Sequence, residues 1–206
     1  MQLLTLTDLP LDLQRRTTRH SLNSGQILFQ QGEAAKHLYW VASGQLRLVS
    51  FVKQRMITHY FVEAGDLFAE SALHFDTYGC TVIATMSSEV VAIPKEEFAT
   101  ALQRSPALSE RYLTSLTHRF HSVKTLLELR SITSARDRLL HYLMQRRSPG
   151  QTTVTLDKPL NAIASELALT PEGLSRLLAR LQSDGIITRK KRSISFAQEW
   201  LEDITE

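Results

Sequence analysis

The feature that most constrains the fold is a change of sequence pattern at Lys95. Before it, short runs rich in β-branched and aromatic residues are interrupted by glycine or a polar cluster about every ten residues. After it, apolar residues recur at spacings of three and four, as they do in amphipathic helices. The chain is therefore predicted to be α+β, with an N-terminal antiparallel sandwich or barrel and a helical C-terminal part.

The N-terminal strands are expected in four segments of this pattern. They are "GQILFQQGE" (25–33), "HLYWVASGQLRLVSFV" (37–52), "MITHYFVEAGD" (56–66) and "CTVIATMSSEVVAIP" (80–94). Four glycines are expected in turns that require positive φ, namely Gly25, Gly32, Gly44 and Gly65.

Composition narrows the class of protein. The 206 residues, 43% apolar and 22% charged, are typical of a globular chain with one large or two small domains. A single cysteine, Cys80, excludes an intrachain disulfide and any cysteine-only zinc or iron–sulfur site within one chain. The N-terminus does not resemble a secretory signal, and no apolar run approaches about 18 residues. A soluble cytoplasmic protein that does not enter a membrane is expected.

A long helix is predicted after the short helix that ends before Pro106. Five apolar side chains on it fall within an arc of about 80°, which is narrow and typical of a coiled-coil contact. We call them the seam: Leu113, Leu116, Phe120, Val123 and Leu127. Polar flanks at Arg119, Lys124 and Glu128 favour pairing with a second copy of the chain. The alternative is that this face packs on the chain's own β-domain.

A boundary is expected where the seam loses its register. Ser134 and Asp137 resemble a helix N-cap box that opens a new helix. The predicted domains are residues 1–105, 106–132 and 133–206. Within the last, the linker "SPGQTTVTLDKP" leads to two helices joined by a tight turn, and then to a small strand and a closing helix.

The second of these two helices has a buried face and a polar face. Thr170 is a plausible N-cap and Pro171 fits the first helical position. Leucines are expected to anchor one face, at Leu174, Leu177, Leu178 and Leu181. The other face carries Glu172, Ser175, Arg176, Ala179 and Arg180. A helix that reads the major groove needs polar residues at its N-terminal turn.

Each polar residue there has a distinct capacity to contact a base. Arg176 can donate two hydrogen bonds to guanine, Glu172 can accept from the amino group of cytosine or adenine, and Ser175 permits close approach. An acid facing DNA repels phosphate, so Glu172 favours sequence reading over nonspecific binding. The alternative is an ordinary amphipathic helix with an incidental Glu172–Arg176 pair at i,i+4.

A basic run follows the helix. "TRKKRS" places Arg189, Lys190, Lys191 and Arg192 in succession, although the net charge of the chain is only +3. Beside a candidate reading helix, this run is expected to contact phosphates, as the hairpin of a winged helix does. The expected DNA contacts are Thr170, Glu172, Ser175, Arg176, Arg180, Arg189 and Lys190.

Over nearly its full length the chain resembles the Crp/Fnr family of bacterial transcription regulators. "GQILFQQGE" and "LYWVASGQLRLV" resemble the family's β-roll turns, and "GDLFAESAL" resembles the start of its effector cassette. Glu172, Ser175 and Arg176 match the E-x-x-S-R signature of the Fnr-type helix. The resemblance implies a cyclic-nucleotide-binding-like β-roll, a dimerisation helix and a winged helix-turn-helix. It further implies a homodimer on an inverted repeat of TTGA-like half-sites, with RNA polymerase as a partner and no enzymatic activity.

The resemblance also implies an effector pocket in the β-roll. Its expected members are Asp66, Glu70, Tyr78, Gly79, Cys80, Val123 and Lys124. Cyclic-nucleotide responders carry an early acid, for which Asp66 or Glu70 is available, and a later Arg-Ser pair. That pair aligns with residues 78–80, which contain no arginine, so a cyclic phosphate would lack its charge-assisted partner. This argues against cyclic AMP. The iron–sulfur sensors of the family carry several N-terminal cysteines, which this chain lacks, so no cluster is expected.

Other signals stay open. Haem is an option because some relatives bind it through histidine, and the candidates are His59, His74, His118 and His121. Solvated or hydrogen-bonded histidines are the alternative, and Cys80 is either a redox reporter or an ordinary core thiol. The remaining alternative is that the protein needs no ligand and is controlled by its abundance. An enzyme or small-molecule carrier using the β-roll is a different class, for which the sequence offers no nucleophile–base motif and no phosphate loop.

Overall fold

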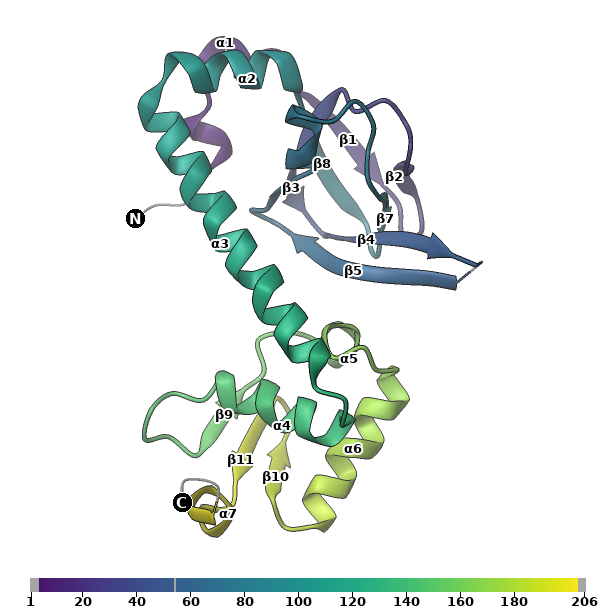
Figure 1. Cartoon of the computed structure of the whole chain (residues 1–206), viewed down its shortest axis with the longest axis vertical. Coiled ribbons are helices and arrows are strands. Elements are labelled where there is room, and N and C mark those ends of the chain that lie inside the picture. The colour runs from purple at the N-terminus through teal and green to yellow at the C-terminus, as the bar shows by residue number, and fades with distance from the viewer. Residues whose placement is uncertain (1–3, 54, 204–206) are drawn as a thin grey trace. The chain divides into compact units, whose positions relative to one another are not determined.

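The structure is a computed structural model that describes residues 4–53 and 55–203 (Figure 1). It forms two compact units, which divide between Phe120 and His121, inside one long helix. Each unit has its own hydrophobic core, as separate domains do. The three-part division at residues 105 and 132 stays a prediction. Among the described helices, none is long and apolar enough to cross a membrane.

The N-terminal unit contains two antiparallel sheets. Its strands are β1 (Thr18–Leu22), β2 (Ile27–Phe29), β3 (His37–Ser43), β4 (Gln45–Val52), β5 (Arg55–Glu63), β6 (Leu67–Phe68), β7 (Thr81–Ala84) and β8 (Ser88–Pro94). The sheet orders are β1-β8-β3-β6 and β2-β7-β4-β5. Alternate side chains of both sheets, such as Val41 and Leu46, fill one shared core. The predicted antiparallel β-roll is confirmed.

The turn from β3 to β4 depends on Gly44. Its φ is +84°, which L-residues rarely adopt. A Cβ at this position would lie 2.3 Å from Ser88 Oγ and 2.6 Å from the Ser87 carbonyl oxygen. Ser88 Oγ also accepts a hydrogen bond from the Gln45 N–H at 3.1 Å, so this contact fixes the turn. Positive φ is confirmed at all four predicted positions.

Helices cover one end of this unit. They are η1 (Leu6–Asp8), α1 (Leu11–Gln14), η2 (Glu70–Leu73), α2 (Lys95–Arg104) and the start of α3 (Pro106–Ser131). A second core lies between these helices and the first sheet, with Leu38, Phe98 and Leu108 almost fully buried. The break between α2 and α3 falls at Ser105, because the residue before a proline disfavours helical φ and ψ.

The C-terminal unit packs helices on a small sheet. Its elements after α3 are α4 (Ala135–Gln145), β9 (Thr153–Thr155), α5 (Leu160–Glu166), α6 (Pro171–Ser183), β10 (Ile187–Lys190), β11 (Ser193–Phe196) and α7 (Gln198–Asp203). Ser134 caps α4 by accepting from the Asp137 N–H at 3.2 Å, as predicted. The predicted linker, residues 148–159, also contains β9, which pairs with β11 and was not expected.

Candidate nucleic-acid interface

The turn between α5 and α6 closes on an alanine in a glycine-like conformation. Ala168 has φ 51°. Its N–H donates to the Ser165 carbonyl at 3.1 Å, and the Leu169 N–H donates to the Ala164 carbonyl at 2.8 Å. These are the two hydrogen bonds of a Schellman motif, in which glycine usually holds the left-handed position. The turn therefore carries backbone strain beside the predicted reading helix.

We expect Ala168→Gly to raise the free energy of unfolding by about 0.5–1 kcal/mol. Glycine removes the left-handed strain, and its greater freedom in the unfolded chain offsets part of the gain. Denaturant unfolding of the whole chain measures the change. The matched control is Ala179→Gly on the exposed face of α6, expected to destabilise by about 1 kcal/mol. A destabilised Ala168→Gly protein would contradict the assignment of strain.

The start of α6 is capped as predicted. Thr170 Oγ1 accepts from the Gly173 N–H at 3.0 Å, and Pro171 occupies the first helical turn. Three of the four predicted anchors, Leu174, Leu178 and Leu181, are each 1% exposed, and Leu177 is partly buried against the same core. The leucine face therefore fixes how α6 rotates about its axis, which determines the face left to solvent.

That solvent face carries the predicted reading residues. Glu172, Ser175, Arg176 and Arg180 are all exposed. In the described part of the chain, no ion pair joins Glu172 to Arg176. The incidental i,i+4 pair is therefore not formed, and the carboxylate and guanidinium are both available to a partner.

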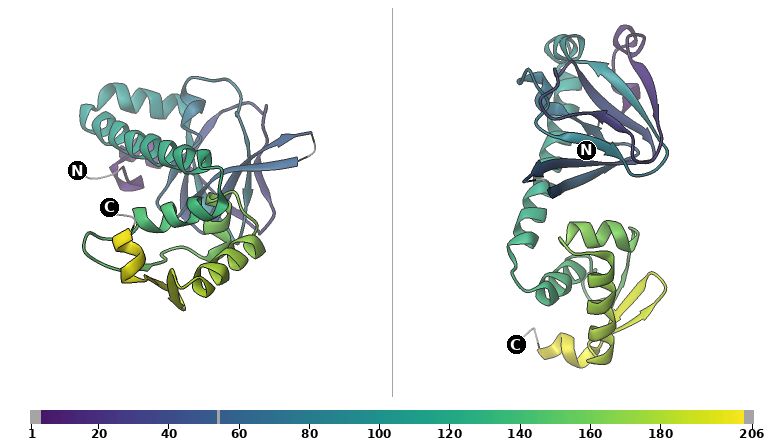
Figure 2. Two further views of the ribbon diagram at one scale, coloured as in Figure 1. Left: turned by 60° about the horizontal axis from the view of Figure 1, so that its bottom comes forward. Right: turned by 90° about the vertical axis from the view of Figure 1, so that its right-hand side faces the viewer.

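A basic hairpin lies beside α6 (Figure 2). β10 and β11 pair antiparallel, and Lys191 at their turn has φ 55°. Lys190, Lys191 and Arg192 are exposed, and Arg189 is partly exposed. No carboxylate among the described residues forms an ion pair with any of the four. Uncompensated cations next to a polar helix face are the electrostatic pattern of a nucleic-acid surface.

The seam on α3 is exposed along its whole length. The exposed fractions are 62% for Leu113, 38% for Leu116, 71% for Phe120, 41% for Val123 and 70% for Leu127. Burial of this face against the chain's own β-domain, the alternative considered above, is therefore wrong. A continuous apolar stripe on a helix is an expected site of protein association.

Two family models match the chain in this order. The cyclic nucleotide-binding domain matches residues 19–105, and the Crp-like helix-turn-helix domain matches residues 137–199. The chain belongs to the Crp/Fnr family of bacterial transcription regulators. Its helix-turn-helix is accordingly a DNA-binding domain, formed by α5 and α6.

Curated relatives and solved structures agree with the family. The fumarate and nitrate reduction regulatory protein of Escherichia coli is 27% identical over 184 residues, covering 84% of this chain and 72% of the relative. The cyclic AMP receptor protein of Thermus thermophilus is 27% identical over 167 residues, covering 79% and 76%. A CooA variant from Carboxydothermus hydrogenoformans has TM-score 0.69 at 20% identity, covering 93% and 89%. The last likeness concerns the fold alone.

The predicted effector segment, residues 65–80, which we call the cassette, holds its two predicted acids against α3. Arg119 Nη2 donates to Asp66 Oδ1 at 3.1 Å and to the Leu67 carbonyl at 2.8 Å. Arg119 Nε lies 3.6 Å from Glu70 Oε1. The side chains of Arg119 and Glu70 are only 19% and 17% exposed. Burial raises the pKa of Glu70, and the charge of Arg119 opposes that rise.

The other cassette candidates provide no cation. The Tyr78 ring stacks on Phe29 with centroids 3.7 Å apart, and its hydroxyl donates to the His37 carbonyl at 3.0 Å. Gly79 is exposed, and burial raises the pKa of the half-buried Cys80 thiol. A cyclic phosphate needs a free guanidinium or ammonium, and Arg119, the arginine at the cassette, is already paired. Residues 65–80 and Arg119 therefore leave no unpaired guanidinium or ammonium group for a cyclic phosphate.

Arg119→Gln should make the free energy of unfolding depend more strongly on pH than in the unmodified protein. Without the guanidinium, the buried Glu70 carboxyl faces Asp66, Tyr60 and Tyr112, so its pKa rises further. Because the carboxyl pKa is raised in the folded state, the folded protein keeps this proton up to a higher pH than the unfolded chain does. Relative to the unmodified protein, the variant therefore loses about 1–3 kcal/mol of stability as pH rises from the ordinary carboxyl pKa through the raised one.

Unfolding curves of Arg119→Gln at several pH values measure this loss. The matched control is Lys124→Gln, because Lys124 pairs with Glu128 at 3.4 Å on the exposed surface. Its stability should follow that of the unmodified protein at every pH. A pH profile for Arg119→Gln that is no steeper than that of the unmodified protein would show that the ion pair does not hold the cassette.

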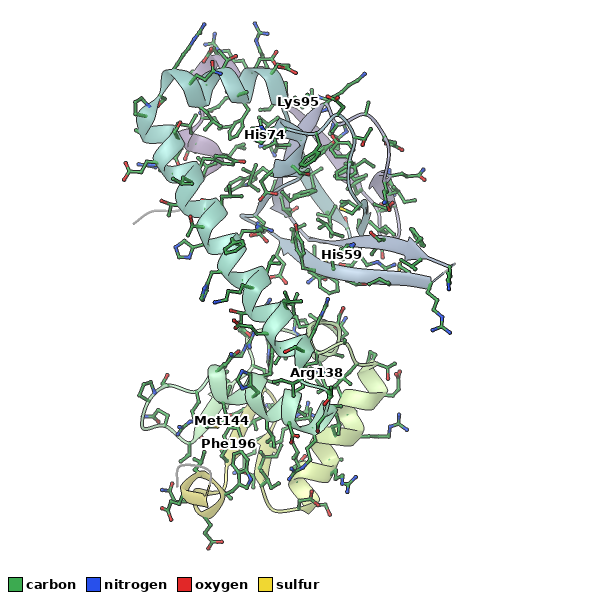
Figure 3. The ribbon with its side chains drawn as sticks, viewed as in Figure 1. His59, His74, Lys95, Arg138, Met144 and Phe196 are labelled. Atoms are coloured by element: carbon green, nitrogen blue, oxygen red, sulfur yellow. The ribbon has the colours of Figure 1, made fainter. Side chains whose placement is uncertain are left out.

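The remaining candidates lie in different places. Figure 3 shows His59 on β5 well apart from His74, which follows η2. His59 Nε2 is 2.8 Å from Ser50 Oγ, and His74, His118 and His121 are exposed. Among the described residues, no three histidine, cysteine or acidic side chains form a group able to hold a metal. Val123 and Lys124 belong to the C-terminal unit, so their place in the pocket stays a prediction.

Sequence reasoning missed the main contact of the cassette. Arg119 was taken as a flank of the seam, whereas it binds residues 53 positions away. Nothing in the local pattern around Arg119 indicates that long-range contact. The unusual signal available was two acids close together, Asp66 and Glu70, in a chain segment that otherwise forms a core.

Proposed function

We propose that the chain is a homodimeric regulator that reads an inverted repeat of TTGA-like half-sites in double-stranded DNA. The observation that carries this proposal is the free polar face of α6, with Glu172, Ser175 and Arg176 exposed above a buried leucine face. Glu172 would repel a phosphate backbone, so its place on this face favours base contact. Thr170, Arg180, Arg189 and Lys190 provide backbone contacts beside it.

Dimerisation through the seam supports the same proposal. Two copies that pair along α3 would bury the five exposed apolar side chains, in a parallel coiled-coil contact. A twofold dimer places two α6 helices in successive major grooves, about one helical turn apart. Bound at a promoter, it would act with RNA polymerase in the cytoplasm, where bacterial DNA lies.

The β-roll is the expected place for an effector. We infer that the β-roll does not respond to cyclic AMP, because Asp66 and Glu70 are held by Arg119 and residues 78–80 provide no cation. Control by another ligand, by haem or by protein abundance stays compatible with the fold. No enzymatic activity is proposed, since the relatives of this chain are transcription regulators.

Arg176→Ala is expected to weaken binding to a TTGA palindrome by about 1–3 kcal/mol and to relax the choice at one guanine position. Binding to a scrambled duplex should change much less. Fluorescence anisotropy with both duplexes at fixed salt measures the two losses. Equal losses on the two duplexes would show that Arg176 contacts only phosphate.

Lys190→Ala provides the comparison. It should weaken binding to both duplexes similarly and reduce the slope of log K against log salt by about one. If the unmodified protein does not distinguish the palindrome from the scrambled duplex, the half-site assignment is wrong.

A further inference from the structure

The end of α5 leaves carbonyl groups that the helix itself does not bond. The last four carbonyls of an α-helix have no intrahelical donor and need partners from elsewhere. The Schellman turn supplies two of them, through the Ala168 and Leu169 N–H groups. The carbonyls of Glu166 and Leu167 still require donors, and they lie directly before the turn into α6.

Arg130, at the end of α3, supplies the first donor. Its Nε donates to the Glu166 carbonyl at 3.3 Å, and its Nη2 donates to the Ser165 carbonyl at 3.2 Å. A guanidinium suits this place because the C-terminal end of a helix carries partial negative charge. Its planar fork also spans two neighbouring carbonyls, which an ammonium group does not do in the same geometry. The dimerisation helix thereby contacts the first helix of the DNA-binding motif.

Arg138, on α4, supplies the second donor. Its Nε donates to the Leu167 carbonyl at 2.8 Å, and its Nη1 donates to the Ile132 carbonyl. Ile132 lies in the short segment between α3 and α4, so one side chain joins that segment to the turn of the helix-turn-helix. Figure 3 shows Arg138 where the end of α3, α4 and α5 come together. All of these contacts lie within the C-terminal unit.

We propose that Arg130 and Arg138 are positioning residues for DNA reading, and we call the pair the arginine clamp. The clamp fixes the turn between α5 and α6 relative to the end of α3, which carries Val123 and Leu127 of the seam. The clamp contacts no base itself; it affects DNA reading by holding α6 in a fixed orientation. The inference rests on the proposed function, because it assumes that α6 reads base sequence.

The first experiment measures DNA binding by Arg138→Lys in the full chain. The lysine variant keeps the positive charge but does not bridge two carbonyls with a planar fork. Its affinity for the TTGA palindrome should fall by about tenfold or more, which corresponds to misplacing about one base contact. Its affinity for a scrambled duplex should stay within about twofold, because the charge is retained.

The matched control is Arg136→Ala on the same helix. Arg136 is exposed, and its ion pair at 3.8 Å is with its neighbour Asp137. The affinity of Arg136→Ala should fall by the same small factor for the palindromic and the scrambled duplex. If Arg138→Lys behaves like Arg136→Ala, or loses affinity equally on the two duplexes, the clamp does not position α6.

Amide hydrogen exchange tests the clamp without DNA. In Arg130→Lys and Arg138→Lys, residues 164–170 should exchange about tenfold faster, since local opening of the turn becomes easier. Peptides covering the buried part of α4, at Leu139–Leu143, should keep their exchange rates. Unchanged exchange at the turn would overturn the proposal, and so would faster exchange throughout the unit. This measurement remains decisive if the TTGA assignment itself fails.

Discussion

Phe120→Glu should dissociate the proposed dimer into monomers and reduce the affinity for an inverted-repeat duplex by about a hundredfold or more. Phe120 is 71% exposed at the centre of the seam, with Leu116 and Val123 one turn away on either side. A twofold contact would bring two carboxylates together in an apolar interface, where each lacks a partner. A monomer presents one α6, so it loses the simultaneous binding of two half-sites.

Sedimentation at several concentrations measures the first effect, and anisotropy with palindromic and single half-site duplexes measures the second. Phe75→Glu is the matched control, because Phe75 is 65% exposed but lies in the cassette region and outside the seam. It should remain dimeric. A dimeric Phe120→Glu protein would place the interface on another surface of the chain.

Gly44→Ala should lower the free energy of unfolding by about 2–5 kcal/mol. The left-handed backbone costs an L-residue about 1–2 kcal/mol, and forcing a methyl group into a packed site adds about 1–3 kcal/mol. The added Cβ would lie 2.7 Å or less from two backbone atoms and Ser88 Oγ, and the two backbone atoms have little freedom to move. Denaturant unfolding of the whole chain, followed by a probe of the N-terminal unit, measures the loss.

Gly25→Ala separates the cost of the left-handed backbone from the cost of the steric clash. Gly25 also has φ +84°, but no atom lies within 4 Å of a Cβ built there. It should show the backbone cost of about 1–2 kcal/mol without the clash. Equal losses for the two variants would mean that the β3–β4 turn relaxes away from Ser88 without cost.

The elements with strong local signals were predictable. Thr170 and Pro171 mark the start of α6 because capping depends on adjacent residues, and the leucine spacing sets its buried face. Strands β1, β6 and β9 were not predicted. β6 has two residues and β9 has three, too few to show a period, and four of the five residues of β1 are exposed. Their pairing is decided by distant partners, such as Val91 opposite Arg19.

In the candidate site too, features set by local sequence were predictable and features set by tertiary contacts were not. Exposure of Glu172, Ser175 and Arg176 follows from helical geometry alone, so the structure agrees with the sequence there. The contacts of Arg119, Arg130 and Arg138 depend on tertiary packing, and all three side chains bind backbone carbonyls, which leave no trace in a residue pattern. The sequence therefore predicted which side chains of α6 are exposed, and it did not predict the arginine contacts to distant parts of the chain.

Arg119 and Phe120 are adjacent on α3, yet one binds the cassette and the other is exposed on the seam. Thermodynamic linkage then applies in both directions. A molecule that draws Asp66 or Glu70 away from Arg119 and thereby changes the dimer equilibrium by some factor must itself bind monomer and dimer with affinities that differ by that factor. Protein concentration would then tune the sensitivity to such a signal, and the signal would tune the concentration at which the protein pairs.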